Sequence, residues 1–464
     1  MSDRETSDEY DVIVIGAGPA GEVAAGRLAE GGLKVAMVEK HLVAGECSYY
    51  ACMPSKALLR PGELLREASR VPGVEQSVTD QLDVGAALRR RDEVIHDLDD
   101  SAQLPWLEEK GIDLIRGTGG LDGERTVRVG DRTLTAREAV IVSTGTGPAI
   151  PPIEGIEDVD IWNNRDATTA KSAPESMIVL GGGPVGCELA QAWASFGTEV
   201  TLIEPMPRLL AREESFAGEQ VAASLQKNWG VTVIFGAKAE RVSQDGEITV
   251  ELNDGQSVTA EKLLVATGRK PMLDGLGLES IGLDSSGYIE TKDNLQVDGY
   301  EWLYAIGDIN GRVLLTHMGK YQAWIASECI MGRGVAEIAE PYGAPRVTFT
   351  DPQVAAVGLT EGDARGKGMD IDVVDVPTAA PAGASFYGKD VDGTCRLVID
   401  RSDATIIGAT FTGFETAEMI HAATIAMVGE VPMDRLRHAV PSFPTRSEIW
   451  LRLIEKYESR ADKG

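Results

Sequence analysis

The sequence has no long run of apolar residues, and no segment approaches the ~18 consecutive apolar residues that a membrane-spanning helix needs. The first ten residues hold neither a basic nor an apolar stretch, so we expect no secretory signal peptide. Basic residues are also in deficit, with 44 Lys and Arg against 73 Asp and Glu and a formal net charge of -29. This balance argues against nucleic acid and membrane surfaces as partners. The acidity fits a halophilic source or an ordinary acidic cytoplasmic enzyme, and we favour the latter.

Cysteine and histidine are equally scarce, with 5 residues of each. So few cysteines do not make a disulfide scaffold, and the close pair Cys47 and Cys52 in a cytosolic chain indicates catalysis or metal binding. The histidines show no ligand-like spacing with cysteines, so we expect no metal. The remaining cysteines lie in apolar segments and are expected to be packed thiols, namely Cys187, Cys329 and Cys395.

The length of 464 residues predicts two to four domains. Residues 11–40 and 176–205 share one pattern, in which an apolar strand-like run leads through a glycine-rich turn and a helix-like stretch to a second strand-like run ending in an acid. Each segment is therefore predicted to be a βαβ unit, and finding it twice predicts two dinucleotide-binding domains. A charged, helix-like segment at about 60–110 follows the first unit, and a Pro-rich joint at 147–152 precedes the second.

After residue 341 the pattern changes to strand-like runs such as 346–350 and 395–399, followed by helix-like stretches at about 415–428 and 445–459. This part has no nucleotide fingerprint. The sequence therefore predicts an α+β domain with a role in assembly.

The first glycine-rich turn, residues 16–21 with the sequence GAGPAG, matches the pattern G-x-G-x-x-G. Gly16 permits the tight turn, Gly18 lets a pyrophosphate approach the backbone, and Gly21 allows close helix–strand packing. The phosphate charge then lies at the N-terminus of a helix. Glu39 ends the second strand, where a carboxylate can accept both ribose hydroxyls.

Residues 181–186, GGGPVG, repeat this arrangement, with Glu204 in the place of the acid. An acid here favours NADH over NADPH, because a 2′-phosphate would meet a like charge. Arg208 lies close by in the sequence and can offset the preference, so NADP(H) is not excluded. Glu204 also fits a solvated strand end.

Cys47 and Cys52 stand just before a helix-forming run at 54–66. A thiolate near a helix N-terminus has a lowered pKa, so such a pair can cycle between dithiol and disulfide. The spacing alone also fits two buried thiols.

Residues 45–59, GECSYYACMPSKALL, resemble the redox-active disulfide segment of the pyridine nucleotide–disulfide oxidoreductases, a family that includes dihydrolipoamide dehydrogenase, glutathione reductase and mercuric reductase. Residues 141–145 (IVSTG) and 264–269 (LVATGR) resemble the segments where the FAD and NAD domains of this family meet. Residues 304–308 (YAIGD) resemble its second FAD fingerprint, and 348–361 (TFTDPQVAAVGLTE) the start of its dimerisation domain. The resemblance covers nearly the whole chain.

The resemblance implies an α/β fold with two Rossmann-like dinucleotide-binding domains, for FAD and NAD, and a C-terminal α+β dimerisation domain. The expected parts are the first part of the FAD-binding domain with the cysteine pair and the helical excursion (1–150), the NAD(P)-binding domain (151–273), the second part of the FAD-binding domain (274–340) and the dimerisation domain (341–464). The implied cofactors are FAD and NAD(H), and the implied assembly is a homodimer.

The resemblance also assigns roles to single residues. Cys52 becomes the flavin-proximal thiolate and Cys47 the thiol that exchanges with substrate, while Lys56 lies near flavin N5 and pairs with Glu188. Hydride is expected to pass from NADH to flavin, and then from flavin to the Cys47–Cys52 disulfide. The expected cofactor-binding residues are Gly16, Gly18, Pro19, Gly21, Glu39, Lys40, Gly45, Glu46, Cys47, Lys56, Gly119, Thr144, Gly145, Gly181, Gly183, Pro184, Val185, Gly186, Glu204, Ala239, Gly268, Arg269, Gly307, Asp308 and Thr316.

One departure from the family pattern concerns proton transfer. In reductases of this family the partner subunit supplies a C-terminal H-P-T-x-x-E run, in which the histidine is the acid–base for thiol exchange and the glutamate orients it. The matching run here is FPTRSE, which keeps the glutamate as Glu448, an expected catalytic residue, and replaces the histidine with Phe443. Phenylalanine cannot move a proton, and such help is worth roughly 10²–10⁴ in rate. His438 lies five residues before this position as an alternative donor.

Further departures bear on the acceptor. Tyr49 and Tyr50 stand between the cysteines, where the family has smaller residues, and either contact a flat substrate or pack in the core. Residues 451–464 hold no cysteine, which argues against a mercuric reductase and a large thioredoxin reductase. Glu204 argues against an NADPH-linked glutathione reductase.

The leading hypothesis is an NADH-dependent flavoprotein disulfide reductase, nearest dihydrolipoamide dehydrogenase, that acts on a small-molecule disulfide or related acceptor. The alternative is a quinone reductase or diaphorase of the same fold without thiol exchange. Phe443 favours the alternative, and the intact cysteine pair favours the leading hypothesis. A third hypothesis, a flavin-holding redox sensor, is disfavoured by Lys56, Glu188 and the two nucleotide sites.

Overall fold

The computed structural model describes residues 8–78, 82–389 and 391–461. The chain divides into two compact units. The first holds the described residues up to Pro54 together with 92–149 and 269–338. The second holds 55–91, 150–268 and the described residues from 339 onward.

The first unit is built on a seven-stranded sheet in the order β3-β2-β1-β6-β5-β4, with β17 paired to β6. Strand β1 runs parallel to β2 and β6, and residues along it alternate between two hydrophobic clusters on opposite faces, with Val12 and Val14 in one and Ile13 and Ile15 in the other. Both faces of this strand are therefore buried, which explains its unbroken apolar sequence. The strands are β1 (Glu9–Ile15), β2 (Val35–Glu39), β3 (Asp113–Arg116), β4 (Gly119–Leu121), β5 (Thr126–Val129), β6 (Arg132–Val142) and β17 (Leu303–Ala305).

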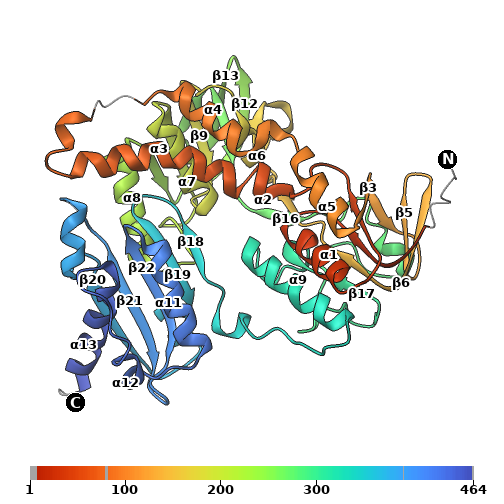
Figure 1. Ribbon diagram of the computed structural model, residues 1–464. Coiled ribbons are helices and arrows are strands. Elements are labelled where there is room, and N and C mark those ends of the chain that lie inside the picture. Colours follow the sequence, from red (N-terminus) through yellow and green to blue (C-terminus); the bar gives the residue numbers. More distant parts are fainter. Residues whose placement is uncertain (1–7, 79–81, 390, 462–464) are drawn as a thin grey trace. The chain divides into compact units, whose positions relative to one another are not determined.

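Helices α1 (Pro19–Glu30) and α9 (Thr316–Ile330) lie side by side against this sheet (Figure 1). Proline and alanine begin α1, and its small residues let α9 approach closely, since a Cβ on Gly319 of α9 would lie 3.3 Å from Ala20. The unit also contains α2 (Gly45–Tyr49), α5 (Leu104–Lys110) and a two-stranded pair made of β7 (Thr146–Pro148) and β16 (Arg269–Pro271).

The second unit repeats the same βαβ plan. Its parallel sheet has the order β11-β10-β9-β15-β8, and a three-stranded antiparallel sheet adjoins it in sequence. The strands are β8 (Ile161–Trp162), β9 (Ser176–Leu180), β10 (Glu199–Glu204), β11 (Thr232–Phe235), β12 (Ala239–Asp245), β13 (Glu247–Leu252), β14 (Ser257–Ala260) and β15 (Lys262–Val265). The helices are α4 (Val84–Val94), α6 (Asn164–Thr169), α7 (Pro184–Ser195) and α8 (Ser215–Trp229), with α3 (Cys52–Arg70) beginning in the first unit and continuing into this one.

The C-terminal part of this unit is an antiparallel sheet in the order β18-β19-β22-β21-β20. Helices α11 (Thr416–Val428) and α13 (Ile449–Ala461) share one hydrophobic cluster with the inward side chains of this sheet, such as Leu397 and Phe411. The strands are β18 (Arg346–Thr348), β19 (Gln353–Gly358), β20 (Ile371–Pro377), β21 (Thr394–Asp400) and β22 (Ile406–Gly413), with short helices α10 (Glu361–Gly366) and α12 (Met433–Leu436).

The predicted fold class is confirmed, because two parallel Rossmann-like sheets precede an antiparallel sheet with helices. The predicted four-part boundaries stay a prediction. The compact units group residues 55–91 with the second unit, whereas the sequence suggested an excursion from the first domain.

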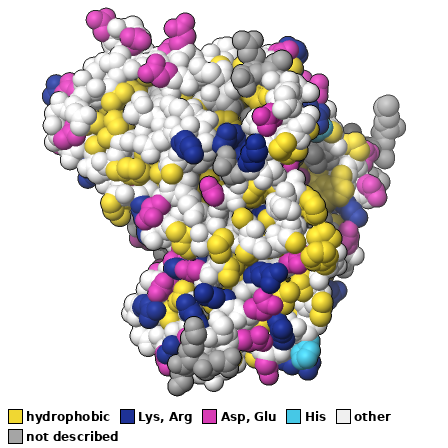
Figure 2. Space-filling view, turned by 90° about the vertical axis from the view of Figure 1, so that its left-hand side faces the viewer, with side chains coloured by type: hydrophobic (Ala, Val, Ile, Leu, Met, Phe, Trp, Pro, Cys, Tyr) yellow, Lys and Arg dark blue, Asp and Glu magenta, His cyan; other side chains and the backbone are white. Residues whose placement is uncertain are grey.

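No helix among the described residues is long and apolar enough to cross a membrane. Acidic and basic side chains are interspersed on the face shown in Figure 2. Elsewhere in the chain, Arg401 forms ion pairs with Asp370 and Asp372, both at 2.8 Å.

Candidate active site

The two glycine-rich turns are built alike, and steric contacts explain the first and the last of the three glycines that the G-x-G-x-x-G pattern defines in each. A Cβ on Gly16 would lie 2.4 Å from the carbonyl oxygen of Ser143, and a Cβ on Gly21 would lie 2.0 Å from that of Gly16. In the second turn a Cβ on Gly181 would lie 2.6 Å from the carbonyl oxygen of Ala266, and a Cβ on Gly186 only 1.9 Å from that of Gly181. Only glycine fits these positions, which lock each strand against its helix.

Gly18 and Gly183, the second glycines of the two G-x-G-x-x-G patterns, have open surroundings instead. A Cβ on Gly18 or on Gly183 would meet no atom within 4 Å, although both residues have ordinary negative φ angles. Each turn therefore leaves an open cradle at the N-terminus of α1 or α7, where free backbone N–H groups favour an anion. These cradles fit the pyrophosphate of a dinucleotide. Gly45 lies against the first one, since its Cβ would be 2.7 Å from the Cα of Gly18.

Glu39 and Glu204 also occupy matching positions. Glu39 accepts hydrogen bonds from the backbone N–H of Ala17 at 2.7 Å and of His41 at 2.6 Å. Glu204 accepts from Gly182 at 2.6 Å and Met206 at 2.8 Å. The backbone thus fixes each carboxylate at the end of its strand, so Glu204 is not merely a solvated strand end.

Arg208, the predicted offset to this acid, donates to the carbonyl oxygen of Ala211 at 2.8 Å. This bond holds its guanidinium to its own loop.

Cys47 lies in α2 and Cys52 is the first residue of α3. The Sγ atom of Cys52 lies 3.5 Å from the Oγ1 atom of Thr316, the first residue of α9. Both thiols are half-buried.

The expectation of a lowered thiol pKa is wrong for Cys47. Its pKa is raised, chiefly because its thiol hydrogen-bonds to Cys52, and also because of burial and the opposing negative charge of an ionised Cys52. Two neighbouring thiols cannot both ionise cheaply, so one of them retains its proton.

A polar group in the first unit joins residues far apart in the chain. Thr146 donates to Asp308 at 2.8 Å, and Arg269 donates to the hydroxyl and to the carbonyl oxygen of Thr146, each at 2.7 Å. The Arg269 guanidinium also lies 3.6 Å from Glu46 and 4.0 Å from Asp308. Burial raises the pKa of Asp308, although Thr146 and Arg269 act against the rise.

Arg269 was expected at the NAD site, and this expectation stays a prediction. Its contacts are with the group around Asp308, the predicted FAD residue. Thr144, two residues before Thr146, donates to the carbonyl oxygen of Met272 at 3.0 Å and joins the segment before β7 to the segment after β16.

Lys56 and Glu188 form the predicted ion pair, at 2.7 Å between Nζ and Oε2. The other carboxylate oxygen of Glu188 accepts the backbone N–H of Phe349 at 2.9 Å. The Lys56 ammonium lies over the Phe349 ring, 4.7 Å from its centroid.

In the C-terminal run, Phe443 is 75% exposed, whereas Glu448 is only 4% exposed. The Oε2 atom of Glu448 is buried and has no hydrogen-bond partner among the described residues. Arg446 between them is buried and donates to the carbonyl oxygens of Thr378 at 3.4 Å and Phe414 at 2.9 Å. His438, the proposed substitute donor, is exposed.

Tyr49 packs in the core, with Ala44 and Ile95 in one hydrophobic cluster. Tyr50 is half-buried at its edge, with the two tyrosine rings 6.5 Å apart. The packing interpretation therefore holds for Tyr49, and a substrate contact remains open only for Tyr50.

The other predicted site residues occupy element ends and turns. Gly307 has a positive φ of 73° and lies against Ala20 of α1. The remaining positions are Pro19 and Pro184 at the first residue of their helices, exposed Lys40 and Val185, Gly119 in β4, Gly145 with φ 71°, Ala239 at the start of β12 and exposed Gly268.

Sequence reasoning missed three residues. Thr146 follows the IVSTG motif directly, and Phe349 lies inside the TFTDPQ run, so a recognised sequence motif lay beside or around each of them. Glu22, in the first turn of α1, had none. Burial raises its pKa to about 7, against the opposing charge of Lys320.

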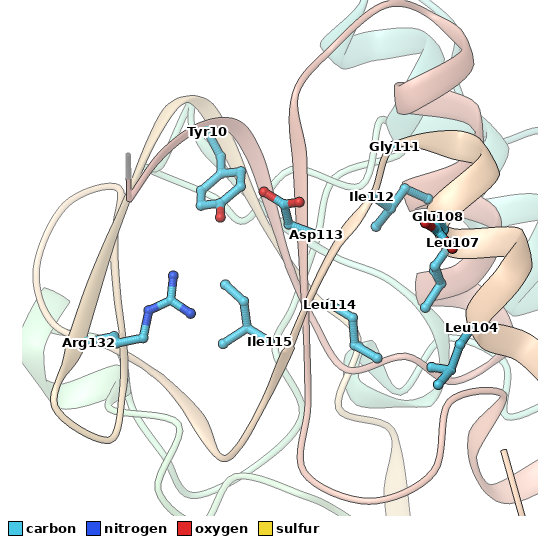
Figure 3. A pocket seen from close by; sticks show the side chains of 10 residues that line it. All are labelled: Tyr10, Leu104, Leu107, Glu108, Gly111, Ile112, Asp113, Leu114, Ile115 and Arg132. Atoms are coloured by element: carbon cyan, nitrogen blue, oxygen red, sulfur yellow. The ribbon is translucent and has the colours of Figure 1, made fainter. Parts of the chain in front are cut away.

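A hollow of about 500 Å³ lies elsewhere in the first unit, and none of the predicted site residues lines it. Figure 3 shows Tyr10, Asp113 and Arg132 on one side of it and the side chains of Leu104 and Leu107 on the other. Burial and the Asp113 carboxylate raise the pKa of Tyr10 to about 12. Among the described residues, no group of three or more His, Cys, Asp or Glu is placed to hold a metal ion.

Comparison with known proteins gives matches along nearly the whole chain. Residues 10–325 match the family model described as pyridine nucleotide-disulphide oxidoreductase, and residues 344–454 match its dimerisation domain. A dihydrolipoyl dehydrogenase from Chlorobaculum tepidum is 35% identical, covering 95% of each protein. A mercuric reductase from Staphylococcus aureus is 32% identical, covering 96% of this chain and 82% of that protein.

Among solved structures, the HOCl-induced flavoprotein disulfide reductase RclA from Escherichia coli superposes with a TM-score of 0.85 at 27% identity, covering 96% of this chain and 99% of RclA. The names of these proteins point to different acceptors. The sequence-based argument against a mercuric reductase therefore stays an expectation.

Proposed function

This chain belongs to the pyridine nucleotide-disulphide oxidoreductase family, and we propose that it passes hydride from NADH through FAD to a Cys47–Cys52 disulfide and on to a small-molecule disulfide or related acceptor. The family is FAD-dependent and uses NAD(P)H, and the chain carries its dimerisation domain. The acceptor and the preference for NADH are the parts proposed here.

The observation that carries the proposal is the close pair of half-buried thiols, in which Cys47 hydrogen-bonds to Cys52 and Cys52 lies 3.5 Å from Thr316 at the start of α9. Bound FAD supplies the electron relay between the nicotinamide and the thiols. Two electrons and one proton convert the Cys47–Cys52 disulfide to a thiol and a thiolate, and we assign the thiolate to Cys52. Cys47 gives up its proton as its sulfur attacks an acceptor disulfide. One acceptor half leaves as a thiol with this proton, and the other half stays bound to Cys47 in a mixed disulfide. The Cys52 thiolate then attacks the sulfur of Cys47 and releases the second acceptor half, which takes a proton from solvent, so that the cysteine disulfide is restored and the acceptor leaves as two thiols.

We assign the remaining residues to binding and orientation. The turn at 16–21 with Glu39 and the group around Asp308 hold FAD, and the turn at 181–186 with Glu204 holds NADH. Glu188 orients the Lys56 ammonium, as their 2.7 Å ion pair supports. Glu448 is the carboxylate that the C-terminal run retains.

Anaerobic titration of the holoenzyme with NADH tests the proposal. Wild type should take up four electrons per subunit, two in flavin and two in the disulfide, and show the long-wavelength band of a thiolate beside flavin. Cys52→Ser should lose the band and take up two electrons. A wild type that takes up only two electrons and shows no band would refute the disulfide step, and a flavin that NADH does not reduce would refute both enzyme hypotheses.

A quinone reductase or diaphorase of the same fold is the second candidate, and exposed Phe443 favours it. An aromatic ring offers a flat acceptor a stacking surface and offers a thiol no proton. Turnover of quinones that survives in Cys47→Ser and Cys52→Ser, with no turnover of lipoamide by wild type, would establish this candidate instead.

A further inference from the structure

The Lys56 ammonium contacts the Glu188 carboxylate and the Phe349 ring in addition to Ser55. Phe349 contacts both members of the Lys56–Glu188 ion pair. The carboxylate of Glu188 lies 2.7 Å from Nζ, and the Phe349 ring centroid lies 4.7 Å from it. The backbone N–H of Phe349 also binds the second oxygen of Glu188 at 2.9 Å. Phe349 therefore contacts the anion through its backbone and the cation through its ring.

The surroundings strengthen the ring contact. The Glu188 side chain is 6% exposed and that of Lys56 is 36% exposed, so the pair lies at the edge of the protein interior. A cation over an aromatic face is stabilised more as solvent is withdrawn from it. The ring of Phe349 packs against the hydrophobic cluster that contains Trp193, whereas the lysine stem is flexible. The fixed partner is the ring.

The position of Lys56 in α3 connects this contact to the thiol pair. Lys56 follows Cys52 by four residues, and residues at this spacing are neighbours on one face of a helix. A cation one turn away favours a thiolate. The Cys47 thiol and the Thr316 hydroxyl also contact Cys52, and neither of these two groups carries a positive charge.

We propose that Phe349 is a positioning residue, whose ring holds the Lys56 ammonium on the face of α3 that carries Cys52 and so favours the Cys52 thiolate. The inference rests on the proposed function, in which Cys52 works as a thiolate. A substitution to Leu or Tyr at position 349 keeps the backbone N–H that donates to Glu188, so exchanging these side chains tests the ring alone.

The experiment uses the holoenzyme in a Cys47→Ser background, in which Cys52 is the single thiol of the pair. The pH midpoint of the long-wavelength thiolate–flavin band is measured with Phe, Leu or Tyr at position 349. We expect Phe349→Leu to raise the midpoint by up to about 1.5 pH units, which is the shift if the whole strength of such a contact reaches Cys52. Phe349→Tyr, which keeps an aromatic face, should leave the midpoint at the parent value.

Phe414→Leu is the matched control, because it removes a ring that lies 4.3 Å beneath the Arg70 guanidinium. It should lower the unfolding temperature without moving the midpoint. If Phe349→Leu leaves the midpoint unchanged, or if Phe414→Leu moves it equally, the inference is overturned.

A second measurement separates this inference from the proposed function. If Cys47→Ser shows no band at any pH, the thiolate–flavin step fails by itself. Acetic anhydride labelling of Lys56, quantified by peptide mass spectrometry, then decides the role of the ring. Faster labelling in Phe349→Leu than in wild type and Phe349→Tyr supports the positioning role, and equal rates refute it.

Discussion

The charge on Glu204 should set the choice between NADH and NADPH. A 2′-phosphate about 4 Å from this carboxylate would be repelled by about 4 kcal/mol per charge pair at an effective dielectric constant of about 20. Solvent and salt at the open side of the cradle reduce this, and about 2 kcal/mol corresponds to roughly thirtyfold discrimination. Glu204→Gln removes the charge and retains an oxygen that can accept the Gly182 N–H.

The assay is stopped-flow reduction of the bound flavin by each nucleotide over a range of concentrations. We expect the ratio of second-order rate constants, NADH over NADPH, to fall roughly thirtyfold in Glu204→Gln, as that repulsion is lost. Glu39→Gln is the matched control, since it alters the same geometry in the other turn and should weaken FAD retention without changing the ratio. An unchanged ratio in Glu204→Gln with full flavin content would refute the assignment of this turn to NADH.

Three further predictions follow from named contacts. A Cβ on Gly18 or Gly183 would meet no atom within 4 Å, so both alanine variants should fold as wild type by circular dichroism. The added methyl group would fill the cradle, so Gly18→Ala should lose FAD and Gly183→Ala should lose NADH affinity in calorimetric titration. Burial raises the pKa of Glu22 from 4.5 to about 7, so the free energy of unfolding should fall as pH rises from 4.5 to 7. Glu22→Gln should remove this fall and be more stable than wild type by up to ~3 kcal/mol above pH 7, measured by urea unfolding. Parallel pH profiles of the two proteins would contradict this prediction. Phe443→His should raise lipoamide turnover by up to roughly 10²-fold and leave quinone turnover flat if proton transfer limits thiol exchange, whereas an unchanged lipoamide rate would count against that account.

The parts of the site that local sequence predicted are those that local sterics determine. A larger residue at Gly16 would clash with the backbone of Ser143, directly after β6, and one at Gly21 would clash with the backbone of Gly16. These contacts impose glycine at both positions, so a six-residue pattern is enough to find them. The acids Glu39 and Glu204 follow their turns at a fixed spacing because a βαβ unit has a fixed length.

Contacts between distant segments were beyond such patterns. Thr146 meets Asp308 across 162 positions, and the N–H of Phe349 meets Glu188 across 161. Nothing in the residues near Thr146 or Phe349 encodes these partners, since each contact depends on how all the intervening elements pack. Family resemblance supplied the Lys56–Glu188 pair, because that pairing belongs to the pattern, and it gave no reason to look at the ring beside it.

The same distinction explains why the acceptor is the open question. A side chain larger than glycine at position 16 or 21 would break the turn, so these residues report on the fold and on the nucleotide it binds. Phe443 is 75% exposed in the single chain, and the fold accommodates phenylalanine or histidine there at little cost in stability. Evidence for the fold therefore carries no information about position 443, although the residue at this position decides whether a proton reaches the acceptor. A disulfide reductase and a quinone reductase can share every buried residue of this structure and differ in this exposed ring, so the two functions are separated by turnover of Phe443→His.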